Sequence, residues 1–462
     1  PRAELLRSWV DKDTAGGPLL VTYLGTMSAE VRRRFAVEAV HNETPVIVVD
    51  DAALAYLAAH GDRQVGTALS VLLPFSSVQP YVRKKRSLVP PEMFYGRATE
   101  RSAVIDAEDT QVVFGGRGLG KSALLDSAKT AFEREPERVA LHIELSTVAM
   151  GQGVQGADAV WDVLLRELRT QGVVPKPGRR DTGKAYDLVR AGVLSWLTAD
   201  SRRRLLVMLD ESDGFFEADA PRFLETNRLK ELGQLPGAQE RAKVVFAGLH
   251  SVQRYSKVSN NTFKHLAQSP TMIGHLSPRH AHKLVTVPMG ALGFRFESDE
   301  LIHRILGHCS YQPFLLQMFC DRLVRHMHDM RRTGIGAQEP PYTVVRADVE
   351  AVEGDPELRE DIIETFRDTL HLDPRYNIIA CVLAHHAYER GLDVRLSEGD
   401  LRGECLDYWR EGFKGLDSDA FRAYLKEMVG LGLLADNRDL RGWRLRSANA
   451  LRMMGTNEAV MT

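Results

Sequence analysis

Residues 115–122 read Gly115-Gly116-Arg117-Gly118-Leu119-Gly120-Lys121-Ser122, between an apolar run that ends at Phe114 and a helix-like segment that begins at Ala123. The spacing G-x-x-x-x-G-K-[ST] is that of a phosphate-binding loop, or P-loop. Glycines let the backbone turn so that several N–H groups point at phosphates, and the following helix presents its positive end to them. Lys121 is expected to reach the β- and γ-phosphates, and the Ser122 hydroxyl to bind Mg²⁺. The motif therefore predicts a site for a nucleoside triphosphate.

A second motif lies further along the chain, where the apolar run 205–209 is followed by Asp210 and Glu211. Such a run is typical of a buried strand in a parallel sheet, and α/β sheets place ligands at the carboxyl ends of their strands. This is a Walker B pattern, in which Asp210 holds Mg²⁺ and Glu211 polarises the attacking water. The two motifs together predict hydrolysis of Mg²⁺-ATP. Asp213 either assists Glu211 or caps the next helix, and we expect the cap.

The composition is that of an ordinary globular protein, with 462 residues, 44% hydrophobic and 26% charged. This length predicts about three domains. The formal net charge of −2 gives no overall attraction to nucleic acid or to an anionic membrane, so any basic surface has to be local. No apolar run approaches the ~20 residues of a transmembrane helix, and no signal peptide is evident. We therefore expect no membrane partner and a cytoplasmic location.

The cysteines have neither C-x-x-C nor metal-ligand spacing. All four lie in helical, mostly apolar contexts, which predicts reduced thiols in the protein core: Cys309, Cys320, Cys381 and Cys405. The chain begins at Pro1 instead of a methionine. We therefore expect a processed or truncated chain that could lack an N-terminal domain.

The first 73 residues have a βαβα pattern without a glycine-rich loop. The expected elements are strands over 19–24 and 46–49, a helix from Ala29 to Val40 with Ser28 as its N-cap, and a helix from Ala52 to Ala59. The pattern resembles part of a Rossmann-like or nuclease-like unit. Asp50 and Asp51 are either a metal-binding carboxylate pair or a strand-end turn that caps the helix, and we favour the turn.

Three further segments strengthen a resemblance to one branch of P-loop ATPases. The turn Tyr95-Gly96-Arg97, followed by Glu100, is similar to the segment that precedes the P-loop in AAA+ and STAND ATPases, including origin-recognition-type and archaeal-ATPase-type members. There it lies against the adenine and ribose. His250 or Ser251, after a strand that begins at Lys243, stands where these proteins carry the sensor 1 residue. Pro313 resembles the proline of the STAND lid, which lies over the adenine, although a proline in the first turn is also ordinary helix chemistry.

The motifs and the resemblance together give a candidate site for ATP and Mg²⁺. Lys121 and Glu211 are the catalytic candidates, and Ser122 and Asp210 are the metal ligands. The expected nucleotide contacts are Tyr95, Gly96, Arg97, Gly115, Gly116, Arg117, Gly118, Leu119, Gly120, Lys121, Ser122, Ala123, His250, Ser251 and Pro313.

We expect an α/β fold, with a P-loop NTPase three-layer αβα core, a helical lid and a C-terminal winged-helix domain, preceded by a short α/β segment. The winged helix is predicted from helices over 356–370, 374–388 and 420–429, followed by a hairpin that returns through Trp443. The expected boundaries are 1–73 for the α/β segment, 74–92 for a linker, 93–276 for the core, 277–335 for the lid and 345–462 for the winged helix.

Three functions are compatible with this organisation. The resemblance implies a nucleotide-dependent STAND/AAA+ switch that couples ATP binding and hydrolysis to oligomerisation or partner engagement, plausible in a bacterial antiviral defence or stress-signalling system. The alternative is a DNA-associated AAA+ ATPase of replication, transposition or restriction, which binds duplex DNA through the winged helix. The third is a scaffold that holds ATP without hydrolysing it, and the presence of Glu211 argues against this. The expected partners are other proteins or further copies of the chain, with duplex DNA as the alternative.

Overall fold

The computed structural model describes residues 19–32, 34–35, 46–59, 72–73, 79–81, 89–106, 110–148, 156–176, 183–248, 270–332, 341–435 and 442–461. The chain divides into two compact units, which are described separately. The first unit comprises Pro1–Gly96 and His275–Thr365, and the second comprises Arg97–Gly274 and Phe366–Thr462.

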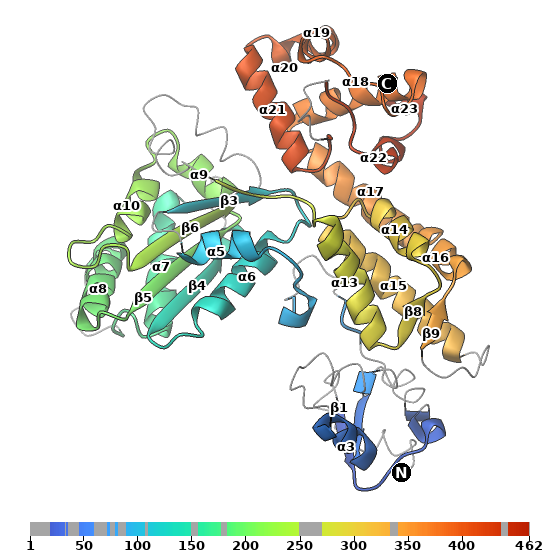
Figure 1. Ribbon diagram of the computed structural model, residues 1–462. Coiled ribbons are helices and arrows are strands. Elements are labelled where there is room, and N and C mark those ends of the chain that lie inside the picture. Colours follow the sequence, from blue (N-terminus) through green and yellow to red (C-terminus); the bar gives the residue numbers. More distant parts are fainter. Residues whose placement is uncertain are drawn as a thin grey trace. The chain divides into compact units, whose positions relative to one another are not determined.

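A five-stranded parallel sheet forms the centre of the second unit (Figure 1). Its strands are β3 (Gln111–Gly115), β4 (Arg138–Glu144), β5 (Arg204–Asp210), β6 (Ala242–Gly248) and β7 (Thr271–Ile273), in the order β4-β5-β6-β3-β7. The predicted P-loop and Walker B strands, β3 and β5, are both present, with β6 between them. The edge strand β7 is short and ends at Ile273.

Helices cover both faces of this sheet, which explains why β5 is apolar along its length. They are α5 (Ala98–Asp106), α6 (Lys121–Phe132), α7 (Val160–Thr170), α8 (Ala185–Ala199), α9 (Asp213–Asp219) and α10 (Leu224–Leu232). Leu205, Val207 and Leu209 face one core with α7 to α10. Successive side chains of a strand alternate between faces, so Met208 and Asp210 lie on the other face, where α6 packs.

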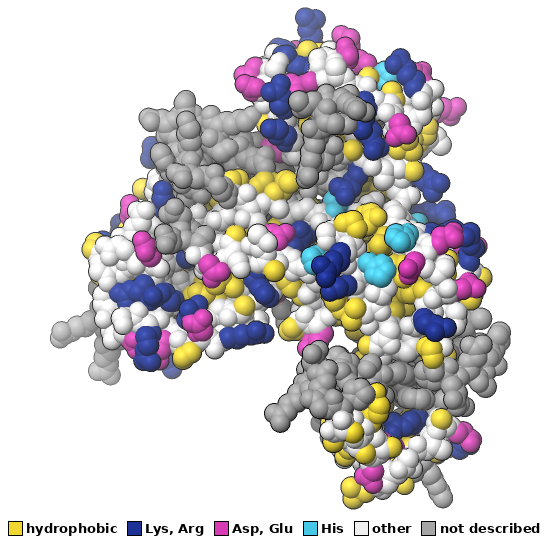
Figure 2. Space-filling model, in the orientation of Figure 1, with side chains coloured by type: hydrophobic (Ala, Val, Ile, Leu, Met, Phe, Trp, Pro, Cys, Tyr) yellow, Lys and Arg dark blue, Asp and Glu magenta, His cyan; other side chains and the backbone are white. Residues whose placement is uncertain are grey.

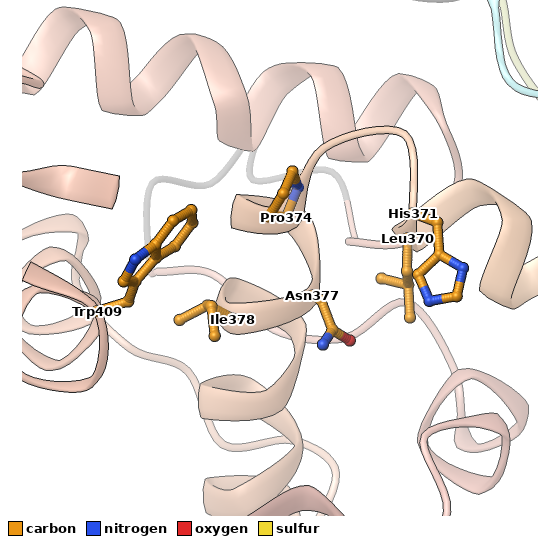
Figure 3. A pocket seen from close by; sticks show the side chains of 6 residues that line it. All are labelled: Leu370, His371, Pro374, Asn377, Ile378 and Trp409. Atoms are coloured by element: carbon orange, nitrogen blue, oxygen red, sulfur yellow. The ribbon is translucent and has the colours of Figure 1, made fainter. Parts of the chain in front are cut away.

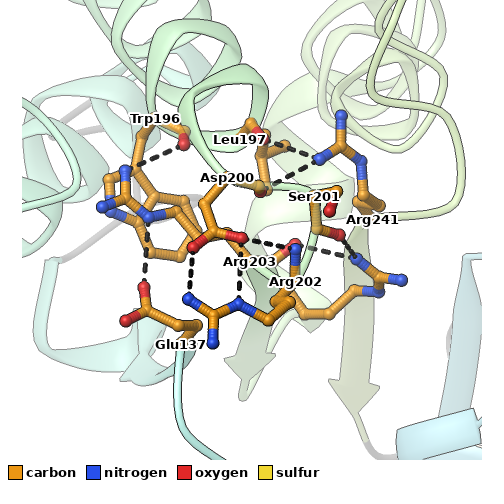
Figure 4. Close-up of polar contacts among 9 residues, drawn as sticks. Glu137, Trp196, Leu197, Asp200, Ser201, Arg202, Arg203 and Arg241 are labelled. Atoms are coloured by element: carbon orange, nitrogen blue, oxygen red, sulfur yellow. Dashed lines mark hydrogen bonds and ion pairs between the residues drawn. The ribbon is translucent and has the colours of Figure 1, made fainter.

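Two arginines, Arg203 beside the start of β5 and Arg241 just before β6, bond to the carboxyl end of helix α8. Arg203 donates to the carbonyl of Trp196, and Arg241 donates to the carbonyls of Leu197 and Asp200 (Figure 4). The last carbonyls of a helix have no partner within it, and cationic donors there also complement the helix dipole. These residues therefore have a structural role at the amino ends of β5 and β6, the opposite edge of the sheet from Asp210.

The C-terminal part of the second unit is helical. Its elements are α17 (Pro356–Leu370, which begins in the first unit), α18 (Pro374–Arg390), α19 (Glu398–Tyr408), α20 (Arg410–Phe413), α21 (Ser418–Gly430), α22 (Ala448–Met453) and α23 (Asn457–Met461). The three predicted helices are confirmed, whereas the other four were not predicted. The expected hairpin is represented by single antiparallel bridges, Leu434 to Leu445 and Leu396 to Trp443. The winged helix itself stays a prediction.

The first unit combines a small parallel β pair with the predicted lid helices. Its elements are β1 (Leu19–Tyr23), β2 (Val46–Asp50), α3 (Asp51–Ala59), η4 (Pro91–Met93), α13 (Pro278–Ala291), β8 (Phe294–Phe296), α14 (Asp299–His308), α15 (Pro313–Arg332), β9 (Tyr342–Val344) and α16 (Arg346–Glu353). The prediction of an all-helical lid was wrong in one respect, because β8 and β9 form a parallel pair. Ser277 caps α13, and its side chain accepts the His280 amide. Ser28 accepts the Val31 amide at the helical turn that begins at Ala29, and residues 36–40 of that predicted helix lie outside the described part.

Asp50 caps helix α3 and is fully buried. Its carboxylate accepts the amides of Ala53 at 2.9 Å and Met27 at 2.8 Å, and it pairs with Arg32 at 2.5 Å. Burial raises the pKa of Asp50, but the two amides and the guanidinium outweigh it and the net pKa is lowered. These partners support the strand-end turn rather than the metal-binding pair.

Tyr81 completes the hydrogen bonding of a helix that contains a proline. Pro288 lies inside α13 and has no N–H, so the carbonyl four residues before it, that of Leu284, loses its helical partner. The buried Tyr81 hydroxyl bonds to this carbonyl at 3.3 Å and to that of Val285 at 3.1 Å. The segment that the sequence presented as a linker therefore contacts α13 at this residue.

Candidate functional site

The P-loop lies between the end of β3 and the start of α6, as the motif requires. Gly118 and Gly120 have φ of 70° and 90°, a left-handed conformation that glycine adopts without steric cost. At Gly115, a Cβ would lie 2.3 Å from the carbonyl oxygen of Ile273 on β7, so no side chain fits there. The glycines therefore shape a loop that leads directly into the amino end of α6, where phosphate groups bind in this motif.

Lys121 is the first residue of α6 and is bonded to the loop itself. Its ammonium donates to the carbonyls of Gly115 at 2.7 Å and Gly116 at 3.0 Å. Burial lowers the pKa of Lys121, and the negative charges of Asp210 and Glu211 act in the opposite direction. This is a buried cation whose present acceptors are two neutral carbonyls, a suitable arrangement for receiving an anionic ligand.

Ser122 and Asp210, the predicted metal ligands, lie in direct contact. The Ser122 hydroxyl donates to Asp210 Oδ2 at 2.6 Å, and Asp210 Oδ1 accepts the amide of Glu211 at 2.9 Å. Burial raises the pKa of Asp210, but hydrogen bonds from His142 and Ser122 and the charge of Lys121 outweigh it, so the pKa is lowered. An ionised carboxylate beside a hydroxyl is a donor set that suits Mg²⁺.

Protein side chains alone would leave this metal site incomplete. Within the described ranges, no group of three or more His, Cys, Asp or Glu side chains could hold a metal ion. Mg²⁺ commonly keeps several waters and takes one or two protein ligands together with substrate phosphates. Ser122 and Asp210 therefore fit an ion that arrives with a nucleotide rather than one that is held permanently.

Glu211 follows Asp210 in a left-handed backbone conformation, with φ of 54°. Such a conformation is uncommon for a residue with a side chain and is found more often near functional sites. Burial raises the pKa of the Glu211 carboxyl, and the Lys121 charge acts against this rise. Asp213 was predicted to cap the next helix, but Ser212 is the N-cap residue and Asp213 is the first residue of α9.

His142 was not predicted as a site residue, yet it contacts the Walker B carboxylate. It lies on β4, with Nδ1 2.7 Å from Asp126 Oδ1 and Nε2 3.4 Å from Asp210 Oδ2. Burial lowers the pKa of His142, but the hydrogen bonds and charges of these two carboxylates raise it to about 9. A carboxylate accepts hydrogen bonds only, so the contacts correspond to a ring protonated on both nitrogens.

Arg97 joins three segments of the second unit. Its guanidinium contacts Glu100 at 3.1 Å, the Leu119 carbonyl in the P-loop at 3.5 Å, and the carbonyl of Gly274 just after β7. The side chain is therefore engaged with the backbone beside the P-loop. Arg117, at the P-loop itself, is half exposed and pairs with Asp368 of α17 at 3.2 Å.

The remaining predicted nucleotide contacts do not lie in the second unit's described part. Tyr95, Gly96 and Pro313 belong to the first unit. There, a Cβ on Gly96 would lie 2.8 Å from the ring of His280, and Pro313 begins α15. His250 and Ser251 lie outside the described residues. Within the second unit, the structure thus brings together the P-loop, Ser122, Asp210 and Glu211.

A groove in the C-terminal part is a separate hollow, with a volume of ≈ 490 Å³ (Figure 3). It is lined by Leu370, His371, Pro374, Asn377, Ile378 and Trp409. The nearby Arg375 guanidinium lies over the Trp409 ring at 5.9 Å and over the Tyr424 ring at 5.4 Å. The lining has no lysine or carboxylate, so the groove offers no counterpart to the chemistry at the P-loop.

The visible surface has basic and acidic side chains interspersed (Figure 2). On α21, Arg422 pairs with Glu398 at 2.7 Å and with Asp419 at 3.4 Å.

The four cysteines are free thiols, and all except the half-buried Cys381 are buried. Among the described residues, no helix is both long and apolar enough to cross a membrane.

No family profile matches the sequence, and no curated protein sequence matches it. Solved structures match in fold. The ORC2 protein of Aeropyrum pernix, in ADPNP–ADP complexes, is similar with a TM-score of 0.51 and 16% identity, covering 82% of this chain and 95% of that chain. A Walker-type ATPase of Pyrococcus abyssi has a TM-score of 0.51 and 12% identity, covering 80% and 99%. The chain therefore has a P-loop NTPase fold, with a five-stranded parallel sheet, and its fold is similar to that of these two proteins over about four fifths of its length.

Proposed function

We propose that the protein binds ATP with Mg²⁺ and hydrolyses it slowly, as a molecular switch. The observation that carries this proposal is the convergence of Lys121, Ser122, Asp210 and Glu211 at the carboxyl edge of the parallel sheet. The four residues come from two motifs that are far apart in the sequence. Their types match the needs of phosphoryl transfer, a cation for the phosphates, oxygen ligands for Mg²⁺ and a base for water.

Each residue has a defined task in this proposal. Lys121 exchanges the Gly115 and Gly116 carbonyls for the β- and γ-phosphates. Ser122 and Asp210 hold Mg²⁺, which supplies positive charge to the phosphate oxygens. Glu211 accepts a proton from the attacking water, a role that its raised pKa favours because a stronger base takes the proton more readily.

The switch would arise because ATP changes the hydrogen bonds of the P-loop. A ligand shifts a conformational equilibrium only if it makes different contacts in the two states. Transfer of Lys121 to phosphate frees the carbonyls of Gly115 and Gly116, and Arg97 bonds to the same loop at Leu119. Changes in the loop can therefore be passed through Arg97 to the end of β7. The role in oligomerisation, in a defence or stress-signalling system, rests on the resemblance to STAND ATPases.

Gel filtration with light scattering tests the switch. The chain is run alone, with ADP, and with a non-hydrolysable ATP analogue and Mg²⁺. A larger assembly in the analogue, absent with ADP and absent in Lys121→Ala, supports a nucleotide-driven switch. An unchanged mass in all conditions, together with retained ATP hydrolysis, contradicts the oligomerisation part of the proposal.

Duplex DNA binding is the alternative, and the same samples test it. Arg422, on helix α21, pairs with Glu398 and Asp419. These carboxylates offset its positive charge, which argues against a phosphate contact by this residue. Binding of duplex DNA that weakens steeply with salt would favour the alternative, because phosphate contacts release counterions.

A further inference from the structure

Four polar side chains form a chain of contacts beneath the P-loop. Ser122 donates to Asp210 Oδ2 at 2.6 Å, and the same oxygen lies 3.4 Å from His142 Nε2. The other ring nitrogen of His142 lies 2.7 Å from Asp126 Oδ1. Ser122 and Asp126 lie one turn apart on the same face of α6, so the contacts return to the helix from which they began.

The strand register explains why these groups meet. On the parallel β4–β5 pair, His142 lies opposite Met208 and Glu144 lies opposite Asp210. Paired residues share a face, so His142 and Asp210 both project toward the face on which α6 packs. His142 therefore lies on the same face of the sheet as the Walker B aspartate, opposite Met208, the residue two positions before Asp210 on β5.

The contacts fix the Asp210 carboxylate from both sides. Oδ1 accepts the Glu211 amide at 2.9 Å, whereas Oδ2 receives both Ser122 and His142. If His142 did not donate, Oδ2 would keep only the Ser122 hydroxyl, a group that rotates freely about its own C–O bond. The Glu211 amide would still hold Oδ1, but the position of Oδ2 would then depend on a single mobile donor.

We propose that His142, held by Asp126, is a positioning residue that orients the Asp210 carboxylate for the Mg²⁺-nucleotide complex. With Oδ2 fixed, the Ser122 hydroxyl directs its hydrogen at Asp210 and leaves its lone pairs available to the cation. This inference rests on the proposed ATP and Mg²⁺ site. Partners of this kind, which orient a metal ligand without touching the metal, typically change metal affinity about 10- to 100-fold when removed.

The sign of the effect separates positioning from simple charge. A cationic ring near Asp210 repels Mg²⁺. Charge alone therefore predicts that removing the ring increases the gain in nucleotide affinity that Mg²⁺ provides. Positioning predicts that removing the ring decreases this gain in affinity.

The two amide replacements distinguish the contacts, because the Asn amide reaches about as far as Nδ1 and the Gln amide about as far as Nε2. His142→Asn keeps the Asp126 side, and His142→Gln keeps the Asp210 side.

The experiment compares the affinity for a non-hydrolysable ATP analogue, by calorimetry, in Mg²⁺ and in EDTA. The ratio of the two dissociation constants measures the enhancement by Mg²⁺ and needs no catalytic turnover. We expect the enhancement to fall about tenfold in His142→Asn and to be largely restored in His142→Gln. His303→Asn, at an exposed histidine of the first unit, is the matched control and should keep the wild-type ratio.

The outcomes are distinct. An unchanged or larger ratio in His142→Asn overturns the proposal, and so does an equal loss in both variants, which would mean that the ring only fills space. A wild-type protein whose affinity is the same in Mg²⁺ and in EDTA contradicts the proposed metal site itself.

A second measurement tests whether Asp126 holds the ring. Unfolding of the metal-free, nucleotide-free protein is measured for His142→Gln, which loses the Asp126 contact, for Asp126→Asn and for the double variant. Because residues in direct contact are energetically coupled, we expect the two changes not to add. Strict additivity overturns the role assigned to Asp126.

Discussion

The ammonium group of Lys121 donates to the carbonyl oxygen of Gly115 at 2.7 Å, so the lysine of the P-loop is bonded to the loop itself. A second bond reaches Gly116 at 3.0 Å. Phosphate oxygens are stronger acceptors than peptide carbonyls, because hydrogen bonds between charged groups are roughly twice as strong as neutral ones. An incoming triphosphate can therefore displace both carbonyls, and the loop changes its internal bonding when it does so.

Replacing Lys121 with alanine should abolish ATP binding. We expect the affinity to fall at least about 100-fold (~3 kcal/mol), since the cation that faces the phosphates is removed. Stability should change little, because the loss of two hydrogen bonds is offset by removal of a buried charge. Calorimetry measures the affinity, with Lys129→Ala on the same helix as the control. Micromolar affinity in Lys121→Ala would contradict the assignment of the P-loop.

Replacing Glu211 with glutamine should separate binding from hydrolysis. The amide keeps the size of the side chain but cannot accept the proton of water, so turnover should fall about 10²-fold or more. ATP affinity should stay close to that of the wild type. Phosphate release measures turnover, and Glu217→Gln on α9 provides the control. Normal turnover in Glu211→Gln would transfer the role of base to another group, with Asp213 as the next candidate.

His142 should make the stability of the metal-free protein depend on pH. Its pKa is about 9 in the fold against an ordinary value of 6.5, so the folded protein holds this proton more tightly than the unfolded chain does. The stabilisation is complete below the unfolded pKa and is lost as the pH rises through about 9. Denaturant unfolding in EDTA, without nucleotide, should show the advantage of wild type over His142→Asn shrinking between about pH 6 and about pH 9.5. A constant difference across this range would show that the ring is not the titrating group.

The nucleotide motifs could be predicted because each is a contiguous segment with its own physical requirements. The P-loop needs glycines and a helix start within a few residues, and Asp210 follows an apolar strand directly. His142 could not be found in this way. His142 matters because it contacts Asp210 on the neighbouring strand β5 and Asp126 on α6. The residues around His142 in the sequence do not indicate either contact.

Short elements were missed for a related reason. β8 and β9 have three residues each and pair across a long separation in the chain, from Phe294–Phe296 to Tyr342–Val344. Three residues are too few to establish an alternating pattern, so the tertiary pairing decides the structure. Asp213 was assigned as the cap because aspartate is a good N-cap residue, whereas the helix begins one residue earlier than that reading requires.

Replacing Asp50 with alanine should loosen the N-terminal β pair. The change removes two amide contacts and leaves Arg32 without its buried partner, which typically costs about 3 kcal/mol. Hydrogen exchange of the β1 and β2 amides should accelerate accordingly. Asp51→Ala, at the exposed neighbour that accepts the Gly25 amide, is the control and should have a much smaller effect. Slower exchange in the wild type on adding Mn²⁺ would revive the metal-binding interpretation.

The bond between Tyr81 and the carbonyl left free by Pro288 affects where the chain can be divided. The sequence suggests that residues 74–92 can be cut to isolate the parts on either side. A fragment that starts after Tyr81 would carry α13 with a buried carbonyl deprived of its donor, a defect that costs about 1–3 kcal/mol. A fragment that starts before Gln79 also keeps its bond to the Asp321 carbonyl of α15. The useful boundary for a shortened protein therefore lies ahead of residue 79 and not within the apparent linker.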